Sequence, residues 1–309
     1  MKIHVIIDFM HIYYKYFFQL SEGKLKHLSA PVDWNGTVIE KDVSLIYYPL
    51  KDIEGIRKSL ETLGHDVTMS ICFDSKSHRQ DDGVAGGTEY KANRTKSLNE
   101  NDFKNIEFIN KKLIEAGHNT YKFDGYEADD IASYLVRNYA GSFDYNVIYT
   151  NDKDLLVNIN EKVGVMRFKQ YKGYTQVDMN NYEQYLEPEF KTFIPYNALG
   201  LYLSSVGDKA DGISGIKGFG PKAFGKLITK VAAKNEIDWK ACGDYNKLAE
   251  VVVMCEEFLE PTQYEQLQTS FALVANLEII DDVTFPSSRS TQDLREKAYM
   301  PMNMVSLVP

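Results

Sequence analysis

The sequence predicts an α/β protein with a mostly parallel central sheet and flanking helices. Apolar, β-branched runs of strand length alternate with helical patterns through the first part of the chain. Three of the predicted strands end in, or just before, an aspartate, namely Asp8, Asp74 and Asp152. The carboxyl ends of parallel strands share one edge of a sheet, where open α/β sheets bind their ligands. We therefore predict an acidic site at this edge.

The first elements follow from local patterns. Residues 3–8 (IHVIID) predict a buried strand, and the aromatic run after them predicts a helix. We expect this run to pack in the core, although one exposed ring such as Tyr14 could stack on a base. Residues 21–48 are interpreted as a loop with two short strand-like runs. An amphipathic helix is expected at 52–63 and a second strand at 67–74.

The stretch 125–155 carries two acidic groups on either side of a helix and a strand, the strand being residues 146–150. The carboxylates are Glu127, Asp129, Asp130, Asp152 and Asp154. An acidic first turn of a helix is common, because the helix dipole favours negative charge there. Capping and a solvated turn therefore remain an alternative. Five crowded carboxylates repel one another, however, and a bound cation would remove that cost.

A long polar segment, residues 75–101, interrupts the α/β pattern before a helix expected at 105–117. It is rich in glycine and contains five cations, Lys76, Arg79, Lys91, Arg94 and Lys96. Such long irregular segments are usually functional or disordered. Because it follows Asp74, we expect a basic flap above the acidic edge, suited to a phosphate-bearing substrate. A solvated insertion is the alternative.

The second half begins with a hairpin predicted at 164–177 and becomes helical from Tyr182. Residues 207–227 are rich in glycine and lysine and run into a helix. Backbone N–H groups and lysines there predict a phosphate cradle that does not read sequence, formed by Lys217, Gly218, Gly220, Lys222 and Lys226. An ordinary glycine-rich helical hairpin is the alternative. Asp208 and Asp211 open the segment and could reach the acidic edge.

Composition describes an ordinary globular protein of 309 residues with a net charge of −9. The opening apolar run is broken by charged residues, so we expect neither a signal peptide nor a membrane span. Cys72, Cys242 and Cys255 have no paired spacing, which argues against zinc and disulfides and for a reducing cytoplasm. The acidic balance argues against nucleic-acid binding, unless the excess carboxylates gather at a metal site.

Taken together, these motifs resemble the flap endonuclease and 5′→3′ exonuclease superfamily, especially the phage and bacterial 5′ nucleases. The resemblance covers residues 3–282. It rests on IID at 6–8, CFD at 72–74, YKANR at 90–94, YEADD at 126–130, TNDKD at 150–154, the segment 207–227 and the weaker FALVANLEIID at 271–281. One departure is Phe9, where the family usually has a small residue.

The resemblance implies three parts. Residues 1–195 would form a PIN-like nuclease core with a flexible helical arch around 75–104. Residues 196–285 would form a helical region whose helix–three-turn–helix element holds duplex DNA, and residues 286–309 a tail. The matching metal-site carboxylates are Asp8, Asp74, Glu127, Asp129, Asp130, Asp152, Asp154, Asp208 and Asp211. The match also makes Lys91 and Arg94 catalytic arch cations, and lets the carbonyls of Gly215, Ile216 and Phe219 hold a monovalent cation such as K⁺.

We therefore expect a Mg²⁺-dependent, structure-selective 5′ nuclease that hydrolyses DNA by a two-metal-ion mechanism in replication or repair, including RNA primer or flap removal. Oxygen ligands suit Mg²⁺ or Mn²⁺. Two ions would activate a water and stabilise the leaving oxygen. The first ion is assigned to Glu127, Asp129 and Asp152, and the second to Asp154, Asp208 and Asp211. Asp8 and Asp74 would orient the metal waters.

The expected substrates are 5′-flap, nicked or 5′-ended duplexes, including RNA/DNA hybrids. We expect a monomer in the cytoplasm of a bacterial or phage-infected cell, with a replication protein as a partner of the tail. Two alternatives stay open. A PIN-type single-strand RNase would lack the basic flap and residues 207–227. A non-catalytic branched-DNA-binding protein would gain nothing from carboxylates that repel phosphate.

Overall fold

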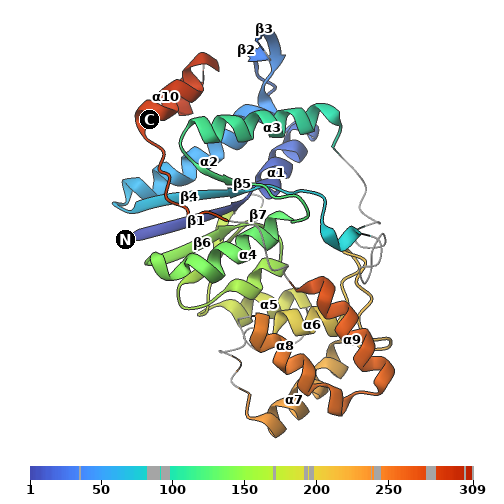
Figure 1. Ribbon diagram of the computed structural model, residues 1–309. Helices are drawn as coiled ribbons and strands as arrows, with labels where there is room; N and C mark the ends of the chain where they lie inside the picture. Colours follow the sequence, from blue (N-terminus) through green and yellow to red (C-terminus); the bar gives the residue numbers. More distant parts are fainter. Residues whose placement is uncertain are drawn as a thin grey trace.

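The computed structural model describes residues 1–34, 36–81, 91, 98–169, 172–190, 194, 198–237, 239, 245–275, 283–302 and 304–307. Its centre is a six-stranded sheet with the spatial order β5-β4-β1-β6-β7-β8 (Figure 1). The strands are β1 (Lys2–Asp8), β4 (Asp66–Cys72), β5 (Asn119–Tyr121), β6 (Tyr145–Tyr149), β7 (Val163–Lys169) and β8 (Gly173–Val177). Neighbouring strands are parallel except for the β7–β8 hairpin. The predicted mostly parallel sheet is confirmed.

Strand β1 lies between β4 and β6, so three carboxyl ends lie side by side. In the register of the sheet, Asp8 is opposite Cys72, and Ile7 is opposite Tyr149. Asp74 follows β4, and Asp152 follows β6. Both residues line one pocket together with Asp8, which shows that they lie at the same edge of the sheet. The three strand-end aspartates therefore meet as the sequence predicted.

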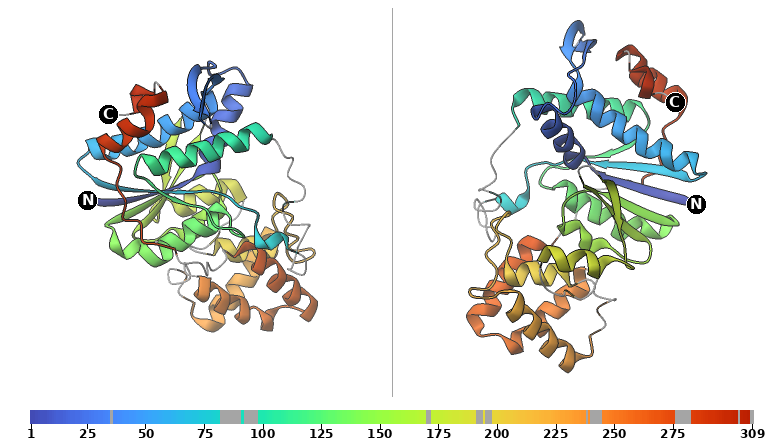
Figure 2. Two further views of the ribbon diagram at one scale, coloured as in Figure 1. Left: turned by 45° about the horizontal axis from the view of Figure 1, so that its top comes forward. Right: turned by 180° about the vertical axis from the view of Figure 1, so that it is seen from behind.

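The sheet separates two hydrophobic cores, because successive side chains of a strand point to opposite faces. Val5 and Ile7 pack in the core that contains α1 (Phe9–Ser21), α2 (Ser44–Thr62) and α3 (Glu100–Glu115). Ile6 packs in the core that contains α4 (Ala128–Tyr139). Figures 1 and 2 show α2 and α3 on one face of the sheet and α4 on the other.

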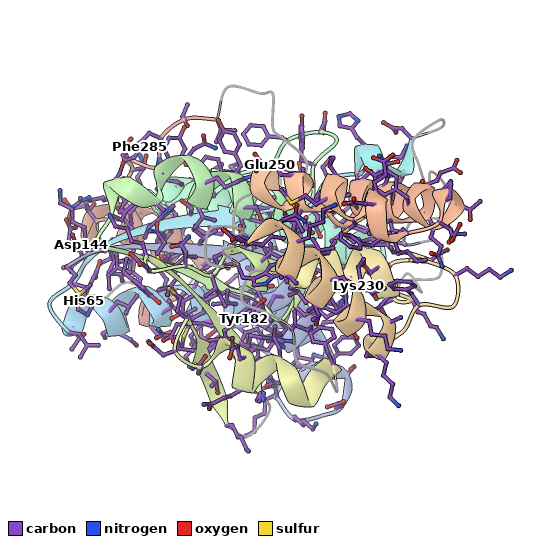
Figure 3. The ribbon with its side chains drawn as sticks, turned by 90° about the horizontal axis from the view of Figure 1, so that it is seen from below. His65, Asp144, Tyr182, Lys230, Glu250 and Phe285 are labelled. Carbon is purple, nitrogen blue, oxygen red and sulfur yellow. The ribbon has the colours of Figure 1, made fainter. Side chains whose placement is uncertain are left out.

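A helical region lies below the sheet in Figure 1. It consists of α5 (Tyr182–Phe190), α6 (Leu199–Val206), α7 (Pro221–Asn235), α8 (Tyr245–Met254) and α9 (Pro261–Val274). Helices α6 and α9 pack side by side. Tyr182, labelled in Figure 3, is fully buried and belongs to the same core as α4, which continues into α6, α7 and α9. The helical region is thus fused to one face of the sheet.

Two helices begin earlier than predicted. Helix α2 starts at Ser44 rather than at residue 52 and contains Pro49 in its interior. Proline usually marks a helix boundary, and this one is buried within the core side of the helix. Helix α3 starts at Glu100 rather than at residue 105, because Asn99 and Asp102 form a capping box at its N-terminus. Strand β5 was not predicted; it has only three residues and lies at the sheet edge.

The two strand-like runs predicted in residues 21–48 form the antiparallel hairpin of β2 (Ser29–Trp34) and β3 (Thr37–Asp42). This hairpin projects from the end of the molecule that carries α2 and α3 (Figure 1). It belongs to a separate two-stranded sheet. Among the described residues, no helix combines the length and apolar character needed to cross a membrane.

The C-terminal tail has more order than its sequence pattern indicated. Helix α10 (Gln292–Tyr299) packs against α3, and Tyr299 is fully buried. The Tyr299 hydroxyl donates a 2.8 Å hydrogen bond to Oε1 of Glu54, which also lies 2.7 Å from Nε2 of His118. Burial alone would raise the pKa of Glu54, but the hydrogen bonds and charges of His118 and Arg57 outweigh it and lower the pKa to about 2. The tail is therefore docked through a buried polar network.

Phe9 does not enter the space above the acidic edge. Its side chain is fully buried, and its ring lies 4.4 Å from that of Phe73 between centroids. The large side chain of Phe9, the first residue of α1, therefore fills part of the hydrophobic core. The departure from the family pattern leaves the edge itself open.

Candidate active site

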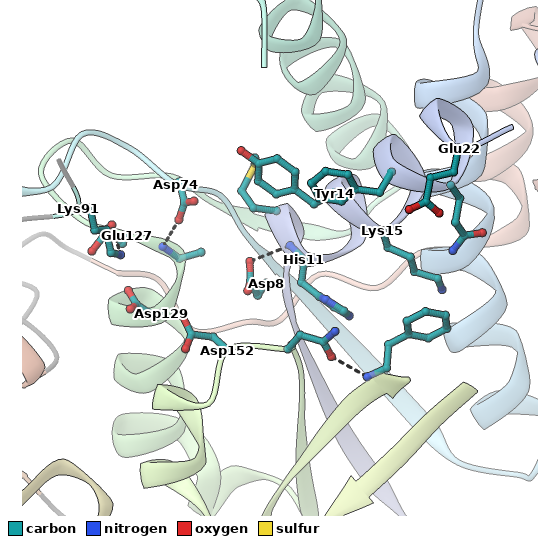
Figure 4. Close-up of a pocket in the computed structure, with 16 residues that line it drawn as sticks. Asp8, His11, Tyr14, Lys15, Glu22, Asp74, Lys91, Glu127, Asp129 and Asp152 are labelled. Carbon is teal, nitrogen blue, oxygen red and sulfur yellow. Dashed lines mark hydrogen bonds and ion pairs between the residues drawn. The ribbon is translucent and has the colours of Figure 1, made fainter. Parts of the chain in front are cut away.

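A cavity of about 600 Å³ opens at the carboxyl ends of β1, β4 and β6 (Figure 4). Six carboxylates line it. Five of them, Asp8, Asp74, Glu127, Asp129 and Asp152, come from the end of β1, from the residues after β4 and β6, and from the N-terminus of α4. The sixth, Glu22, is the C-cap of α1. The tertiary structure thus brings together residues that lie far apart in the sequence.

Short-range hydrogen bonds fix two of these carboxylates. Oδ2 of Asp8 accepts a 2.8 Å bond from the Thr150 hydroxyl, and Oδ1 accepts a 3.3 Å bond from the His11 amide. Asp8 is therefore both the N-cap of α1 and a lining residue of the cavity. Oδ1 of Asp74 accepts a 2.7 Å bond from the Ala128 amide, which joins the end of β4 to the first turn of α4.

The first turn of α4 presents three carboxylates in different settings. Glu127 and Asp130 form a capping box in which the Glu127 amide donates to Oδ2 of Asp130 at 3.1 Å. Asp130 is fully buried, whereas Asp129 is half-buried. Acidic oxygens of these three residues lie within 4.8 Å of one another, close enough to hold a metal ion. The predicted capping and the predicted acidic cluster are thus both present in this turn.

Arg79 lies beside this turn in the 3₁₀ helix η1 (His78–Gln80). Its guanidinium binds Asp130 through two nitrogens at 2.9 and 2.7 Å, and Glu127 at 3.1 Å. The sequence suggested that Arg79 is one of the flap cations, but its side chain is only 2% exposed. Arg79 is a buried partner of the acidic cluster.

Lys91 reaches into the same cavity. Its Nζ atom lies 2.6 Å from Oε1 of Glu127, and its backbone amide donates a 3.0 Å bond to the carbonyl of Asp211. The other predicted arch cation, Arg94, lies outside the described residues. Lys91 therefore connects the segment after β4 with both α4 and the loop that begins at Asp208.

A second acidic cluster consists of Asp154, Asp208 and Asp211, whose oxygens also lie within 4.8 Å of one another. This is the set that the sequence assigned to a second ion. Lys153 binds Asp208 and lies 3.1 Å from Oδ1 of Asp154. Sequence reasoning did not single out Lys153, although its position between Asp152 and Asp154 was the available signal.

The crowding of the carboxylates changes their proton affinities. Desolvation, followed by repulsion from Asp74, raises the pKa of Asp8 to about 7. Desolvation, followed by repulsion from Asp152, raises the pKa of Asp154 to about 7. Asp74 keeps an exposed surface, yet desolvation by the surrounding protein, together with Asp129 and Glu127, raises its pKa to about 6. These shifts mean that the protein alone does not fully compensate the negative charge.

The side chains at this edge suit a hard divalent cation. Carboxylate oxygens are the donors that Mg²⁺ and Mn²⁺ prefer. Two ammonium groups, from Lys91 and Lys153, lie against the two clusters, as expected where carboxylates attract positive charge. Burial alone would lower the pKa of Lys153, but Asp154 and Asp208 outweigh it and raise the pKa. The arrangement can hold cations and place them near a phosphate.

The opposite wall of the cavity comes from α1 and the end of β7. It includes His11, Tyr14, Phe18 and Phe168. The rings of Tyr14 and Phe18 are nearly parallel, with centroids 5.9 Å apart, and Phe18 is 51% exposed. The Nε2 atom of His11 is buried and has no hydrogen-bond partner. The cavity is thus acidic at one end and aromatic at the other.

The predicted phosphate cradle lies between α6 and α7. Gly215 has φ of +66°, and a Cβ there would lie 2.4 Å from the Gly207 nitrogen. Only glycine therefore fits at this close approach of the backbone to Gly207. Ile216 is buried, its carbonyl accepts a 2.9 Å bond from the Phe219 amide, and Phe219 is half-buried. Gly220 is the N-cap of α7 and provides no capping side chain.

Three lysines surround this turn. Lys217, Lys222 and Lys226 are exposed, and Lys222 and Lys226 lie one turn apart on α7. Lys230, labelled in Figure 3, continues the same row. Gly218 is exposed with φ of +78°. The structure therefore gathers the predicted cradle residues at the start of one helix.

The acidic clusters at the carboxyl edge of an α/β sheet, the lysine in the cavity there and the lysine-rich helix start agree with the nuclease class that the sequence motifs resemble. The family described as 5'-3' exonuclease, N-terminal resolvase-like domain, matches residues 3–187. The chain belongs to this 5'-3' exonuclease family.

Individual relatives agree with this assignment. The 5'-3' exonuclease of Bacillus subtilis is 32% identical over 187 residues, covering 58% of this chain and 59% of that protein. DNA polymerase I of Caldicellulosiruptor bescii is 32% identical over 149 residues, covering 48% of this chain and 17% of that protein. The chain thus spans less than two thirds of each of these relatives.

Among solved structures, the bacteriophage T5 D15 flap endonuclease, in a pseudo-enzyme-product complex with DNA and metal ions, has a TM-score of 0.58 to this chain. The two share 16% sequence identity over 98% of this chain and 93% of that chain. At this identity the likeness establishes a shared fold. The roles of individual site residues remain predictions.

Proposed function

We propose that this protein is a structure-selective 5′ nuclease, a 5′→3′ exonuclease or flap endonuclease that hydrolyses phosphodiester bonds of DNA in replication or repair. One observation carries the proposal. Two acidic clusters adjoin the carboxyl edge of a parallel sheet, and Lys91 enters the cavity beside them. A pure DNA-binding surface would not concentrate carboxylates where phosphate must approach.

We assign the first Mg²⁺ to Glu127, Asp129 and Asp152 and the second to Asp154, Asp208 and Asp211, with Mn²⁺ as a substitute. When bound, such ions generate a nucleophilic hydroxide and neutralise the leaving oxygen. Asp8 and Asp74 line the same cavity, and we assign them the orientation of the water molecules there. Asp130 belongs to the first acidic cluster, and its side chain is fully buried.

Lys91 lines the cavity, and its Nζ atom lies 2.6 Å from Oε1 of Glu127. We assign its ammonium to the scissile phosphate. There it would stabilise the charge that develops in the transition state. We assign the same role to Arg94.

The lysines and the helix start around Gly218 and Gly220 would bind the phosphates of the duplex part of the substrate. Carbonyls of Gly215, Ile216 and Phe219 would hold a K⁺ ion at this turn. The aromatic wall at Tyr14 and Phe18 would receive a base next to the cleaved bond. These contacts suit 5′-flap, nicked or 5′-ended duplexes, including RNA/DNA hybrids.

We propose that the protein acts as a monomer. A replication protein that binds residues 286–309 would have to use the outer side of α10, because Tyr299, Met302 and Leu307 are buried against the core. The tail would then cover the hydrophobic core with its buried side chains and bind the partner with its exposed ones.

The experiment compares cleavage of a 5′-flap, a nicked duplex, a single DNA strand and a linear RNA, each with Mg²⁺, with Mn²⁺ and with EDTA. We expect metal-dependent cleavage of the flap and the nicked duplex and none in EDTA. Preferred cleavage of linear RNA would instead indicate a single-strand RNase. Tight flap binding without cleavage in either metal would indicate a non-catalytic binding protein.

A further inference from the structure

Arg79 is the most buried cation near the acidic edge. Its side chain is 2% exposed, and its guanidinium contacts two parts of the chain, the first turn of α4 and Ala275. Two nitrogens bind Asp130, one of them also binds Glu127, and the second also donates a 2.8 Å bond to the carbonyl of Ala275. Such a fork of fixed donors matches carboxylate geometry in a way that an ammonium cannot.

The contact with Glu127 distinguishes the two oxygens of that carboxylate. Oε2 lies 3.1 Å from Nη1 of Arg79, whereas Oε1 lies 2.6 Å from Nζ of Lys91. Lys91 and Glu127 both line the cavity, whereas Arg79 and Asp130 do not. One oxygen of Glu127 is therefore bound by a residue outside the cavity lining, and the other by a residue of the lining; Figure 4 shows Lys91 beside Glu127.

Arg79 is itself held in place from the helical region. Ala275 is the C-cap of α9. The same helix supports the turn before α7, because the Ser270 hydroxyl accepts a 3.2 Å bond from the Gly215 amide and Oε1 of Gln266 accepts a 2.9 Å bond from the Lys217 amide. One helix thus contacts the lysine-rich turn through its side chains and Arg79 through its C-terminal carbonyl.

We propose that Arg79 is a positioning residue for the metal site, which fixes Glu127 so that Oε1 is presented to the cation, with Asp130 as the buried counter-charge that holds Arg79. This inference rests on the proposed function, because it assigns Glu127 to a divalent ion. Partners that orient a metal-binding carboxylate typically change metal affinity by about 10–100-fold when they are removed.

Asp130 then acts through Arg79. It is fully buried, and both of its oxygens bind the guanidinium. If Asp130 and Arg79 form one unit, removing either should cause a similar loss of metal affinity, and removing both should cost no more than removing Arg79 alone. If Asp130 contacts the ion itself, the two losses should add.

The test measures Mn²⁺ binding by isothermal titration calorimetry without DNA, for the parent and for Arg79→Met, Asp130→Asn and the double variant, each with a melting curve. Arg57→Met is the matched control. Arg57 is also 2% exposed and also binds two carboxylates, Glu54 and Glu61, but in the other core. Its loss should lower the melting temperature and leave Mn²⁺ affinity unchanged.

We expect Arg79→Met to weaken binding of the tighter Mn²⁺ ion by about 10-fold or more, with the double variant equal to it. If Arg79→Met does not fold, Arg79→Lys supplies the result against Arg57→Lys. The same direction is expected, because an ammonium lacks the planar fork of donors that binds both oxygens of Asp130. A folded Arg79 variant with parental Mn²⁺ affinity would overturn the inference, and additive losses would overturn the role of Asp130.

The outcome is separable from that of the proposed function. A parent that cleaves flap DNA while Arg79→Met keeps parental Mn²⁺ affinity would leave the function standing and remove the inference. If the parent instead binds Mn²⁺ in a way that depends on Arg79 but cleaves none of the nucleic acids, the inference stands and the proposed function is removed.

Discussion

The Nζ atom of Lys91 lies 2.6 Å from Oε1 of Glu127, so a residue that follows β4 contacts the first turn of α4. The two side chains are largely buried, with 10% and 12% of their side-chain surfaces exposed. In the function that we propose, this pair combines a basic group for a phosphate with an acidic group for a cation.

The first prediction concerns this pair. Lys91→Ala should lower the single-turnover rate of flap cleavage by about 10²-fold or more, because a donor to the transition state is lost. DNA affinity should change little. We predict the same for Arg94→Ala. Lys104→Ala is the control, since Lys104 is an exposed lysine of α3 paired with Glu100. Parental cleavage by Lys91→Ala would remove this residue from the chemistry.

The second prediction concerns the lysine row of α7. Lys222→Glu should weaken duplex binding for every sequence tested and lower the slope of affinity against salt by about one unit for each lost phosphate contact. Fluorescence anisotropy with duplex and single-stranded DNA over a salt series gives both quantities. Lys58→Glu, an exposed lysine of α2, is the charge-matched control. An equal loss for single strands would contradict a duplex-specific role.

The third prediction separates binding from chemistry at Asp152. Desolvation and repulsion from Asp129 raise the pKa of Asp152, so the charged form of this carboxylate is destabilised by its surroundings. Asp152→Asn removes one charge while keeping the shape. It should abolish Mg²⁺-supported cleavage. In EDTA it should bind flap DNA as tightly as the parent or more tightly, because one like charge near the phosphate is gone.

The measurement pairs flap affinity in EDTA with single-turnover cleavage in Mg²⁺, alongside a melting curve. Asp293→Asn, an exposed carboxylate at the start of α10, is the control and should leave all three unchanged. A stable Asp152→Asn protein that cleaves near the parental rate would exclude Asp152 from the metal site.

The fourth prediction concerns stability and pH. His4 is fully buried between Asn146 and Ser70, and burial lowers its pKa from 6.5 to about 4. Below pH 6.5 the unfolded chain takes up a proton that the folded protein excludes. The neutral histidine therefore contributes stability above pH 6.5 that is lost as the pH falls towards 4. The loss by pH 4.5 is about 2–3 kcal/mol.

Urea unfolding of the parent and of His4→Gln at pH 7, 6, 5 and 4.5 tests this. The glutamine does not titrate, so the difference in unfolding free energy between the two proteins should shift in favour of the variant as the pH falls. Two stability curves that stay parallel across this range would show that His4 takes up its proton equally in the folded and unfolded states, and would contradict the lowered pKa.

Local pattern was sufficient for most elements of the fold. The strand ending at Asp8, the helix stripe beginning at Ala128 and the hairpin turning at Gly173 depend on neighbours in the chain, and all three are present. The early start of α2 at Ser44 was not predicted, because its first residues fall in the stretch interpreted as a loop. Ser44, Ile46 and Pro49 of this helix are buried. The helix of the tail was not predicted, because α10 is stabilised by Glu54 and α3, which lie far away in the sequence.

The sequence by itself determined which residues could form the site, since runs that end in aspartate and a lysine-rich turn are local facts of the chain. The separate clustering of Asp154, Asp208 and Asp211 was also anticipated. Only the tertiary structure decided which charged side chains form ion pairs with one another. Arg79 was expected in a basic flap above the acidic edge and is instead buried against Asp130. Lys153 joins Asp154 to Asp208. Ion pairs between distant segments depend on distances and burial that spacing along the chain does not encode.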